Sequence, residues 1–317
     1  MSVGAGARGV SYLIPEYWRS STSEDLKLLR AISTPGLFAE LEPSAGIYTT
    51  DLNDAIRGDW GRTRYSEAII RRKHARFITV HIAALDHLSH EAGPYTKTAF
   101  DSLEEIDKMV AAIEKAMKEE TPETAICIVS DHGFAATERQ LNLRAAFLKA
   151  GLMTVNAKKT GVMGASFSDW RAVPWGTGGS SYVVLKDPKD AALRAQVEKL
   201  LQSLAADPTN GIAAVLDRKG IADLGGTALA DFAVDMTPGF AIGNGRDAVT
   251  AKSGSKGQHG YAPTHPELLA SFVLAGPGVT KGGNLGEIDM RSIAPTLAKL
   301  LGTSLPSAER PALSITK

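Results

Sequence analysis

The sequence predicts an α/β fold with a mostly parallel β-sheet, helices on both of its faces and a smaller inserted lobe. Three runs of mostly apolar residues, many of them β-branched, are separated by segments with helical periodicity. Strands that are buried on both faces of a parallel sheet have this continuous apolar character. A strand, a helix and a second strand in succession usually form a parallel pair joined by a right-handed crossover.

The first unit of this kind covers residues 76–129. Residues 76–85 form the longest apolar run, which predicts a buried strand. Between Phe100 and Met117, apolar residues recur every three or four positions and form one stripe, so we expect a helix packed on the sheet. Residues 125–129 are again apolar and predict the second strand of the unit.

The remaining elements follow from the same two patterns. Gly151 and Gly302 suit the left-handed position that ends many helices. The expected elements are a helix at 140–149, a strand at 181–185, a helix at 191–205, a strand at 268–274 and a helix at 290–301. We expect a core made of residues 1–154 and 245–317, with residues 155–244 as the inserted or peripheral lobe.

Composition excludes several classes of partner. The 317 residues include 35 Lys and Arg against 35 Asp and Glu, so no net field attracts nucleic acid or a membrane surface. No apolar run approaches the roughly 18 residues that a membrane-spanning helix needs. The first ten residues do not resemble a signal peptide, and the compartment stays open. Disulfides play no part, since Cys127 is the only cysteine.

The first cluster of chemically active residues directly follows the longest apolar run. If the chain turns helically there, Asp86 and His90 stand one turn apart with Cβ atoms roughly 5–6 Å from each other, close enough to share an ion. A carboxylate and an imidazole are common zinc ligands. In the alternative reading Asp86 caps a helix and His90 is a surface residue, and His87 is a rival ligand within the same turn.

The second cluster is Asp131-His132-Gly133, directly after the run at 125–129. Neighbouring side chains on a strand point to opposite faces, so Asp131 and His132 share one metal only if the chain has left the extended state. Gly133 permits such a turn. The alternative is a plain turn, which Asp and Gly favour on their own.

The third cluster places His259 between Gly257 and Gly260. The glycines allow the backbone to pass closely around an ion. The alternative is a flexible loop with an incidental histidine. His265, which precedes Pro266, is expected to be a turn residue.

Taken in order, these clusters show a resemblance. Asp86-x-x-x-His90-x-x-Gly-Pro, then Asp131-His132-Gly133, then Gly-x-His259-Gly-Tyr resembles the alkaline phosphatase superfamily, specifically its nucleotide pyrophosphatase and type I phosphodiesterase branch. The resemblance implies an alkaline-phosphatase-like fold and two metal sites. Asp86, His90 and His259 would hold one ion, and Asp131 with His132 the second. Zn²⁺ is the expected metal, with Mn²⁺ or Fe as alternatives.

Two groups of the family pattern have no counterpart in this sequence. Members of the family also use an aspartate from the first strand and a Thr or Ser nucleophile. The opening segment from Val3 to Trp18 resembles the part that follows this nucleophile, so the resemblance implies a chain without the family's amino-terminal portion. Thr177, Ser180 and Ser181 are the candidates for the vacant positions, and the catalytic nucleophile stays unknown.

The function implied by the resemblance is metal-dependent hydrolysis of small phosphate esters, with phosphodiesters, phosphomonoesters and activated triesters as the alternatives. Without the nucleophile, we expect attack by metal-bound hydroxide. The alternative is a degenerate relative that binds metal without turnover. Trp170, Trp175 and Tyr261 could stack on a leaving group or simply pack a loop. A missing first strand would leave an exposed sheet edge, so we also expect a homo-oligomer.

Overall fold

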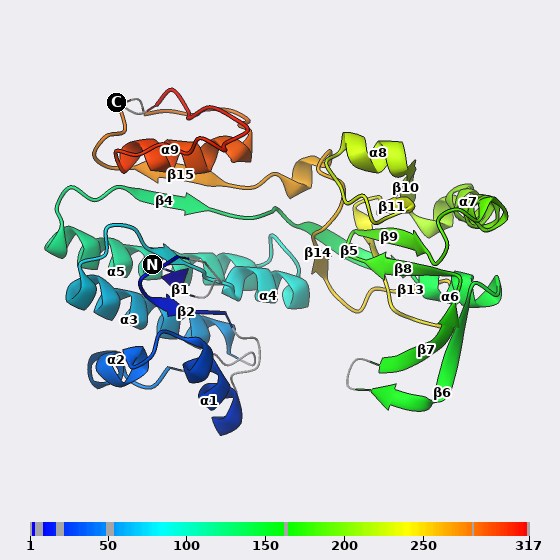
Figure 1. Ribbon diagram of the computed structural model, residues 1–317, viewed down its shortest axis with the longest axis horizontal. Helices are drawn as coiled ribbons and strands as arrows, with labels where there is room; N and C mark the ends of the chain where they lie inside the picture. The colour runs from blue at the N-terminus through cyan, green and yellow to red at the C-terminus, as the bar shows by residue number, and fades with distance from the viewer. Residues whose placement is uncertain are drawn as a thin grey trace. The chain divides into compact units, whose positions relative to one another are not determined.

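The structure is a computed structural model that describes residues 2–3, 9–16, 22–48, 54–161, 164–280 and 282–315. The chain divides into two compact units (Figure 1). The first unit comprises residues 1–81, 107–130 and 271–317, and the second comprises residues 82–106 and 131–270. The long helix α5, Lys97–Glu120, contributes residues to both units.

The first unit is largely helical. Its helices are α1 (Ser23–Ile32), α2 (Leu37–Ala45), α3 (Ala55–Lys73), the second part of α5, a 3-10 turn at Met290–Ser292 and α9 (Ile293–Leu300). Its short strands are β1 (Ser2–Val3), β2 (Leu13–Ile14), β3 (Thr79–Val80), β4 (Ile126–Val129) and β15 (Phe272–Ala275). Strands β2, β1 and β3 form a parallel sheet in that order, whereas β4 pairs antiparallel with β15.

The second unit contains two larger sheets. Strands β10 (Ile212–Asp217), β11 (Phe232–Met236), β9 (Ser180–Leu185) and β8 (Ala172–Gly176) form an antiparallel sheet in that order. Strand β5 (Ala135–Leu141) pairs parallel with β12 (Gly239–Ile242) and antiparallel with β13 (Thr250–Lys252) and β14 (Gly257–Gln258). The hairpin β6 (Met153–Gly161) and β7 (Gly164–Trp170) completes the strands.

Helices of the second unit connect these strands. They are α4 (Ala84–Ala92), α6 (Leu143–Lys149), α7 (Ala191–Ala205) and α8 (Arg218–Asp223), with 3-10 turns at Pro208–Asn210 and Pro266–Leu268. A buried apolar cluster ties α6 and α7 to the strands, with Phe147, Val197, Val183 and Met236 among its fully buried members. Among the described residues, no helix combines the length and apolar character that crossing a membrane requires.

Several expected elements are confirmed. The α/β class is correct, and the helix at 191–205 has the expected bounds. The strand at 181–185 is β9, and the helix at 290–301 appears as a 3-10 turn followed by α9. Gly151 and Gly302 adopt φ angles of 67° and 71°, the left-handed conformation that ends a helix.

Other expectations were wrong in their bounds. In the segment 76–85 only Thr79–Val80 forms a strand, and α4 already begins at Ala84. The helix expected from residue 140 begins at Leu143, because Gln140 and Leu141 end the strand β5. In the segment 268–274 the strand begins only at Phe272.

The described pairing is more mixed than the mostly parallel sheet expected from the sequence. Strand β3 pairs with β1 and β4 pairs with β15, so the parallel pair expected of these two strands is not present among the described ladders. Most of the described ladders are antiparallel. An antiparallel pair can be joined by a short connection, such as residues 177–179 between β8 and β9. The inserted lobe expected at 155–244 lies within the second unit and stays a prediction.

Candidate metal centre

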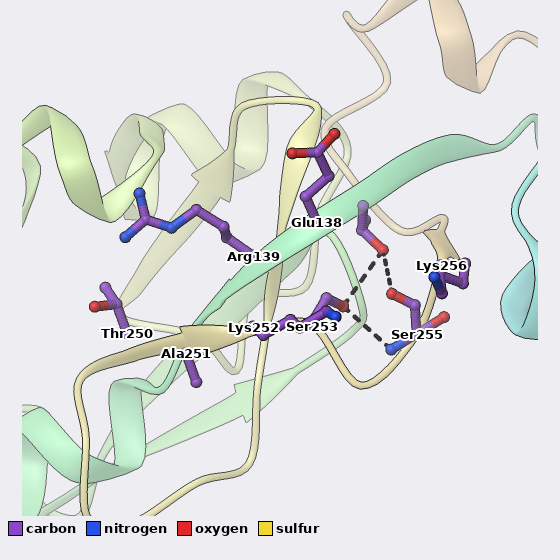
Figure 2. Close-up of a pocket in the computed structure, with 9 residues that line it drawn as sticks. Glu138, Arg139, Thr250, Ala251, Lys252, Ser253, Ser255 and Lys256 are labelled. Carbon is purple, nitrogen blue, oxygen red and sulfur yellow. Dashed lines mark hydrogen bonds between the residues drawn. The ribbon is translucent and has the colours of Figure 1, made fainter.

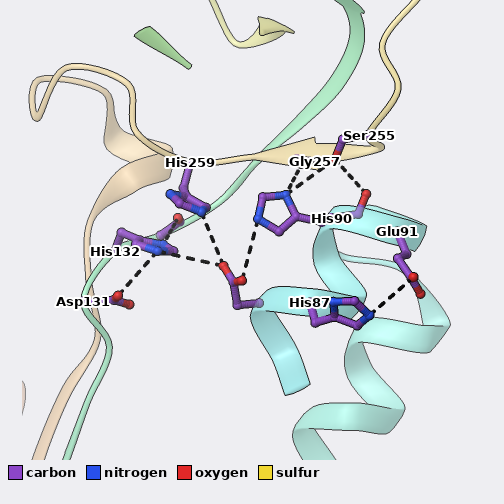
Figure 3. Close-up of polar contacts among 10 residues, drawn as sticks. His87, His90, Glu91, Asp131, His132, Ser255, Gly257 and His259 are labelled. Carbon is purple, nitrogen blue, oxygen red and sulfur yellow. Dashed lines mark hydrogen bonds and ion pairs between the residues drawn. The ribbon is translucent and has the colours of Figure 1, made fainter. Parts of the chain in front are cut away.

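Helix α4 presents Asp86 and His90 on one face. His90 Nε2 lies 3.6 Å from Asp86 Oδ2, which confirms the one-turn spacing expected from the sequence. His87, the rival ligand, lies elsewhere on the helix, with its Nε2 3.4 Å from Glu91 Oε1 (Figure 3). His87 is therefore directed away from the cluster.

The segment after β4 brings Asp131 and His132 to the same place. Strand β4 ends at Val129 and the chain bends at Asp131, so it has left the extended state there, as a shared ion would require. His132 Nε2 lies 3.6 Å from Asp131 Oδ2 and 3.9 Å from Asp86 Oδ1. The side chain of Asp131 is 82% exposed and forms the open side of the cluster.

Gly133 serves close packing rather than a special turn. The sequence suggested that glycine is needed here because it permits an unusual turn. The φ angle of Gly133 is not positive, so this conformational freedom is not used. A Cβ atom at this position would lie 2.2 Å from the carbonyl oxygen of Glu267, and the Gly133 amide donates to the carbonyl of Leu268 at 2.9 Å. Only glycine allows these two backbones to meet beside His132.

His259, the residue directly after the strand β14, completes the cluster, and β14 pairs with β5. Its Nε2 lies 3.6 Å from Asp86 Oδ1, and its ring stacks on that of His132 with centroids 3.8 Å apart. One ligand atom each from Asp86, His132 and His259 lie within 4.8 Å of one another. The ring of Phe134 packs edge-on against His90 and His259 and closes one side.

Backbone carbonyls fix the orientation of two imidazoles. His90 Nδ1 lies 2.9 Å from the carbonyl of Gly257, and His132 Nδ1 lies 3.0 Å from the carbonyl of Gly133. Because a carbonyl only accepts hydrogen bonds, each Nδ1 donates to it, and Nε2 is left as the ring atom that faces the cluster and could bind a metal ion. Metal-binding histidines are commonly held in this way.

The cluster has an excess of acceptors that a cation would satisfy. Asp86 Oδ1 is buried and has no hydrogen-bond partner among the described residues, although it faces His132 and His259. Burial, with a further contribution from His132, lowers the pKa of His259, which favours the neutral imidazole that metals bind. A buried oxygen without a donor is costly, so these residues fit a bound metal ion.

A cavity of about 580 Å³ opens along β5 and β13 (Figure 2). Three basic side chains contribute to its wall, namely Arg139, Lys252 and Lys256. Ser255 in the cavity wall donates to the carbonyl of Gly257 at 2.6 Å, and the same carbonyl lies 2.9 Å from His90 Nδ1, so this loop contributes both to the cavity and to the cluster.

The order and geometry of these residues agree with a match along most of the chain. Residues 7–262 match the family described as type I phosphodiesterase / nucleotide pyrophosphatase. The chain belongs to this family. The branch expected from the three clusters is thereby confirmed.

Solved structures support the fold. Human ectonucleotide pyrophosphatase / phosphodiesterase 5 superposes with a TM-score of 0.56 at 14% identity, covering 86% of this chain and 66% of that chain. For the murine protein the TM-score is 0.54 at 16% identity, over 76% of this chain and 60% of that chain. GPI ethanolamine phosphate transferase 2 of Aspergillus fumigatus is 27% identical over 101 residues, which are 31% of this chain and 13% of the relative.

The chain thus spans 66% or less of the length of these proteins. The likeness to the solved structures confirms the alkaline-phosphatase-like α/β fold. The resemblance drawn from the opening segment concerns residues 3–18, of which 4–8 and 17–18 lie outside the described residues.

The structure brings all five expected ligands together, and their assignment to two ions stays a prediction. His132 lies nearly as close to Asp86 as His259 does, a proximity that the sequence did not reveal. The candidate hydroxyls are engaged elsewhere. Ser180 Oγ donates to the carbonyl of Gly260 and lies 2.7 Å from Thr177 Oγ1, and Ser181 Oγ donates to the carbonyl of Tyr182.

The aromatic residues considered for stacking have different roles. Tyr261 is buried and donates its hydroxyl to the carbonyl of Phe240, so it belongs to the core. Trp170 packs against the same core, whereas Trp175 is exposed. His265, expected to be a turn residue, pairs with the buried Asp235, and no sequence signal singled out this pair.

Proposed function

We propose that this chain hydrolyses phosphate esters at a metal centre formed by Asp86, His90 and His259 on one ion and by Asp131 and His132 on a second. The observation that carries the proposal is the buried Asp86 Oδ1, which faces two imidazoles and finds no hydrogen-bond partner in the described part of the chain. Imidazoles and carboxylates suit Zn²⁺, with Mn²⁺ or Fe as alternatives.

The chain's own residues prepare this centre for an anionic ester. A bound divalent ion supplies Lewis-acid polarisation of a phosphoryl oxygen. The carbonyls of Gly257 and Gly133 hold His90 and His132 with their Nε2 atoms inward before any ion arrives. Arg139, Lys252 and Lys256 add positive charge along the nearby cavity, which favours the approach of an anion.

Water is the attacking group in this proposal. The hydroxyls of Ser180 and Ser181, considered as substitutes for the family nucleophile, donate to backbone carbonyls. A hydroxyl committed in this way has to break a hydrogen bond before it can attack. Water, which reaches the cluster through the exposed side of Asp131, has no such cost.

The substrate class follows from the family and its members. The family is named for phosphodiesters and nucleotide pyrophosphates, and an inactive variant of murine ectonucleotide pyrophosphatase / phosphodiesterase 5 was solved in complex with AMP. We propose a small phosphodiester or phosphomonoester as the substrate, with activated triesters as a further option.

A second candidate is a protein that binds metal without turnover. The engaged hydroxyls of Ser180 and Ser181 favour it, because they leave the described site without the family's nucleophile. Both candidates require the metal centre, and they differ only in catalysis.

Comparison of two histidines of α4 tests the site. In His90→Asn the Nε2 ligand is lost, so we expect the metal content per chain to fall and hydrolysis of an aryl phosphodiester to decrease by at least about tenfold. His87→Asn is the matched control, because His87 lies on the same helix and pairs with Glu91. Metal content is measured by elemental analysis of protein purified without chelator. Turnover is measured before and after a chelator is added.

Each outcome decides between the candidates. Two metal ions per chain with chelator-sensitive turnover in the wild-type protein and in His87→Asn support hydrolysis. Bound metal that depends on His90, without turnover on any phosphate ester tested, supports the second candidate. Equal metal content in the two variants would exclude the proposed ligand set.

A further inference from the structure

Residues at the ends of β9 and β11 form hydrogen bonds with the segment that carries His259. Ser180 on β9 and Asp235 on β11 are register partners in the antiparallel sheet. The amide of Gly179 donates to the carbonyl of His259 at 2.7 Å, and Ser180 Oγ donates to the carbonyl of Gly260 at 2.6 Å. The two peptide groups that flank the Cα atom of Gly260 are thereby hydrogen-bonded to residues 179 and 180.

Asp235 forms hydrogen bonds with the same segment at Ala262 and His265. The residue is only 4% exposed, and its Oδ1 accepts from the amide of Ala262 at 2.7 Å. Oδ2 lies 2.6 Å from His265 Nε2, which donates to it. A buried carboxylate that accepts two hydrogen bonds from one short segment restrains that segment more strongly than neutral groups would.

Close packing leaves this segment little freedom. A Cβ atom on Gly260 would lie 2.0 Å from the carbonyl oxygen of Thr177, and one on Gly179 would overlap the ring of Tyr261. Tyr261 itself is buried and anchored to the carbonyl of Phe240. The segment 259–265 therefore has contacts on several sides, and its position depends on the sheet beneath it.

We propose that Asp235, His265 and Ser180 are positioning residues that place His259 for metal binding. They do not contact the ligand cluster and act through the backbone of residues 259–262. Metal ligands need placement to within roughly 0.5 Å, and the groups that supply it are the hydrogen-bond partners around the ligands. The proposal rests on the proposed metal centre, and it gives the antiparallel sheet of β8 to β11 a role in that centre.

The variant Asp235→Asn tests the link with little change in shape. Asn keeps an oxygen for the amide of Ala262 but puts an NH2 group in place of the carboxylate oxygen opposite His265 Nε2, so the charge-assisted hydrogen bond is lost in either tautomer of the ring. We expect Co²⁺ affinity to fall by about 10- to 100-fold, with a change in the visible absorption of the bound ion. Ser180→Ala should act in the same direction, and Ser180→Thr, which keeps the hydroxyl, should restore the affinity.

Asp231→Asn is the matched control. Asp231 directly precedes β11 in the chain and is buried like Asp235. It accepts from the amide of Leu185 and pairs with Arg194 and Arg218, and none of these groups belongs to the segment 259–265. Its substitution is expected to cost stability without changing Co²⁺ affinity.

A metal-free readout separates this inference from the proposed function. Hydrogen exchange of residues 257–265 in chelator-treated protein should be faster in Asp235→Asn than in Asp231→Asn and the wild-type protein. Equal exchange in the two variants, or faster exchange with unchanged Co²⁺ affinity, would overturn the positioning role. If the wild-type protein binds no Co²⁺, the proposed metal centre fails, whereas exchange still shows whether Asp235 holds the segment.

Discussion

The residue type at position 133 is restricted by the backbone of residues 267–269, which packs closely against it. Gly133 follows His132 directly, and its amide is bonded to the carbonyl of Leu268. A side chain at Gly133 would meet the carbonyl oxygens of Glu267 and Leu269 within 3 Å. Backbone atoms cannot rotate away as a flexible side chain can, so the segment 131–133 or the segment 267–269 has to move.

The substitution Gly133→Ala is therefore expected to damage both stability and metal binding. We expect a loss of about 1 to 3 kcal/mol in the free energy of unfolding, as for other overpacked sites. Because His132 is adjacent, Co²⁺ affinity should fall as well. Gly254→Ala is the control, since no atom lies within 4 Å of a Cβ there. Urea denaturation and Co²⁺ titration measure both effects, and equal results for the two variants would contradict this account.

The sequence predicted the local part of the site well and the long-range part poorly. The spacing of Asp86 and His90 follows from one helical turn, and the structure confirms it. The stacking of His132 on His259 depends instead on the pairing of β5 with β14, more than a hundred residues apart in the chain. No local pattern encodes such a register. The pair Asp235 and His265 was missed for the same reason.

At the scale of elements, the helix at 191–205 was predictable because its apolar stripe, Asp190 cap and length all agree. Strand β5 was not predicted. Its sequence is mostly polar, and only the alternation of buried Ala135 and Thr137 with exposed Ala136 and Glu138 marks it as a strand. The early start of α4 at Ala84 was hidden by the apolar run before it, since such runs suit strands and buried helices alike.

Three buried aromatic residues, two of them tyrosines, pack together beside α2 and α3. The rings of Phe38, Tyr48 and Tyr65 contact one another with centroids 4.9 to 5.5 Å apart. Burial raises the pKa of Tyr48 to about 12, from an ordinary value of 10.0, and Arg62 opposes part of this shift. The phenol thus stays protonated in the folded chain at pH values where the unfolded chain loses its proton.

This shift predicts an alkaline limit to stability. Below pH 10 both states hold the Tyr48 proton, so its contribution is constant, and it is lost as pH rises from about 10 to 12. The loss should amount to about 2 to 3 kcal/mol. Tyr48→Phe should flatten part of this fall in urea denaturation, whereas Tyr95→Phe, at an exposed position, should not. An unchanged pH profile in Tyr48→Phe would refute the assignment.

At the scale of the whole molecule, the sequence predicted the class of the fold better than its sheet pairing. The run at 125–129 has the apolar character of a strand buried on both faces, yet β4 forms a described ladder only with β15. Ile128 is 40% exposed, and its register partner Val273 is 53% exposed. Apolar composition therefore predicted the strand but did not identify its neighbours.

That exposed two-stranded ladder argues for self-association, the homo-oligomer expected from the sequence. Two-stranded ladders are marginal alone, and exposed apolar strands readily pair with another chain. We propose a second copy of this chain as the partner. Light scattering should show a dimer or larger species for the wild-type protein, and Val273→Lys should shift it toward the monomer, because a charge is costly to bury in such a contact. Leu229→Lys, at an apolar position 74% exposed and outside the ladder, should leave the assembly unchanged. A monomeric wild-type protein, or an equal response of the two variants, would exclude association through β4 and β15.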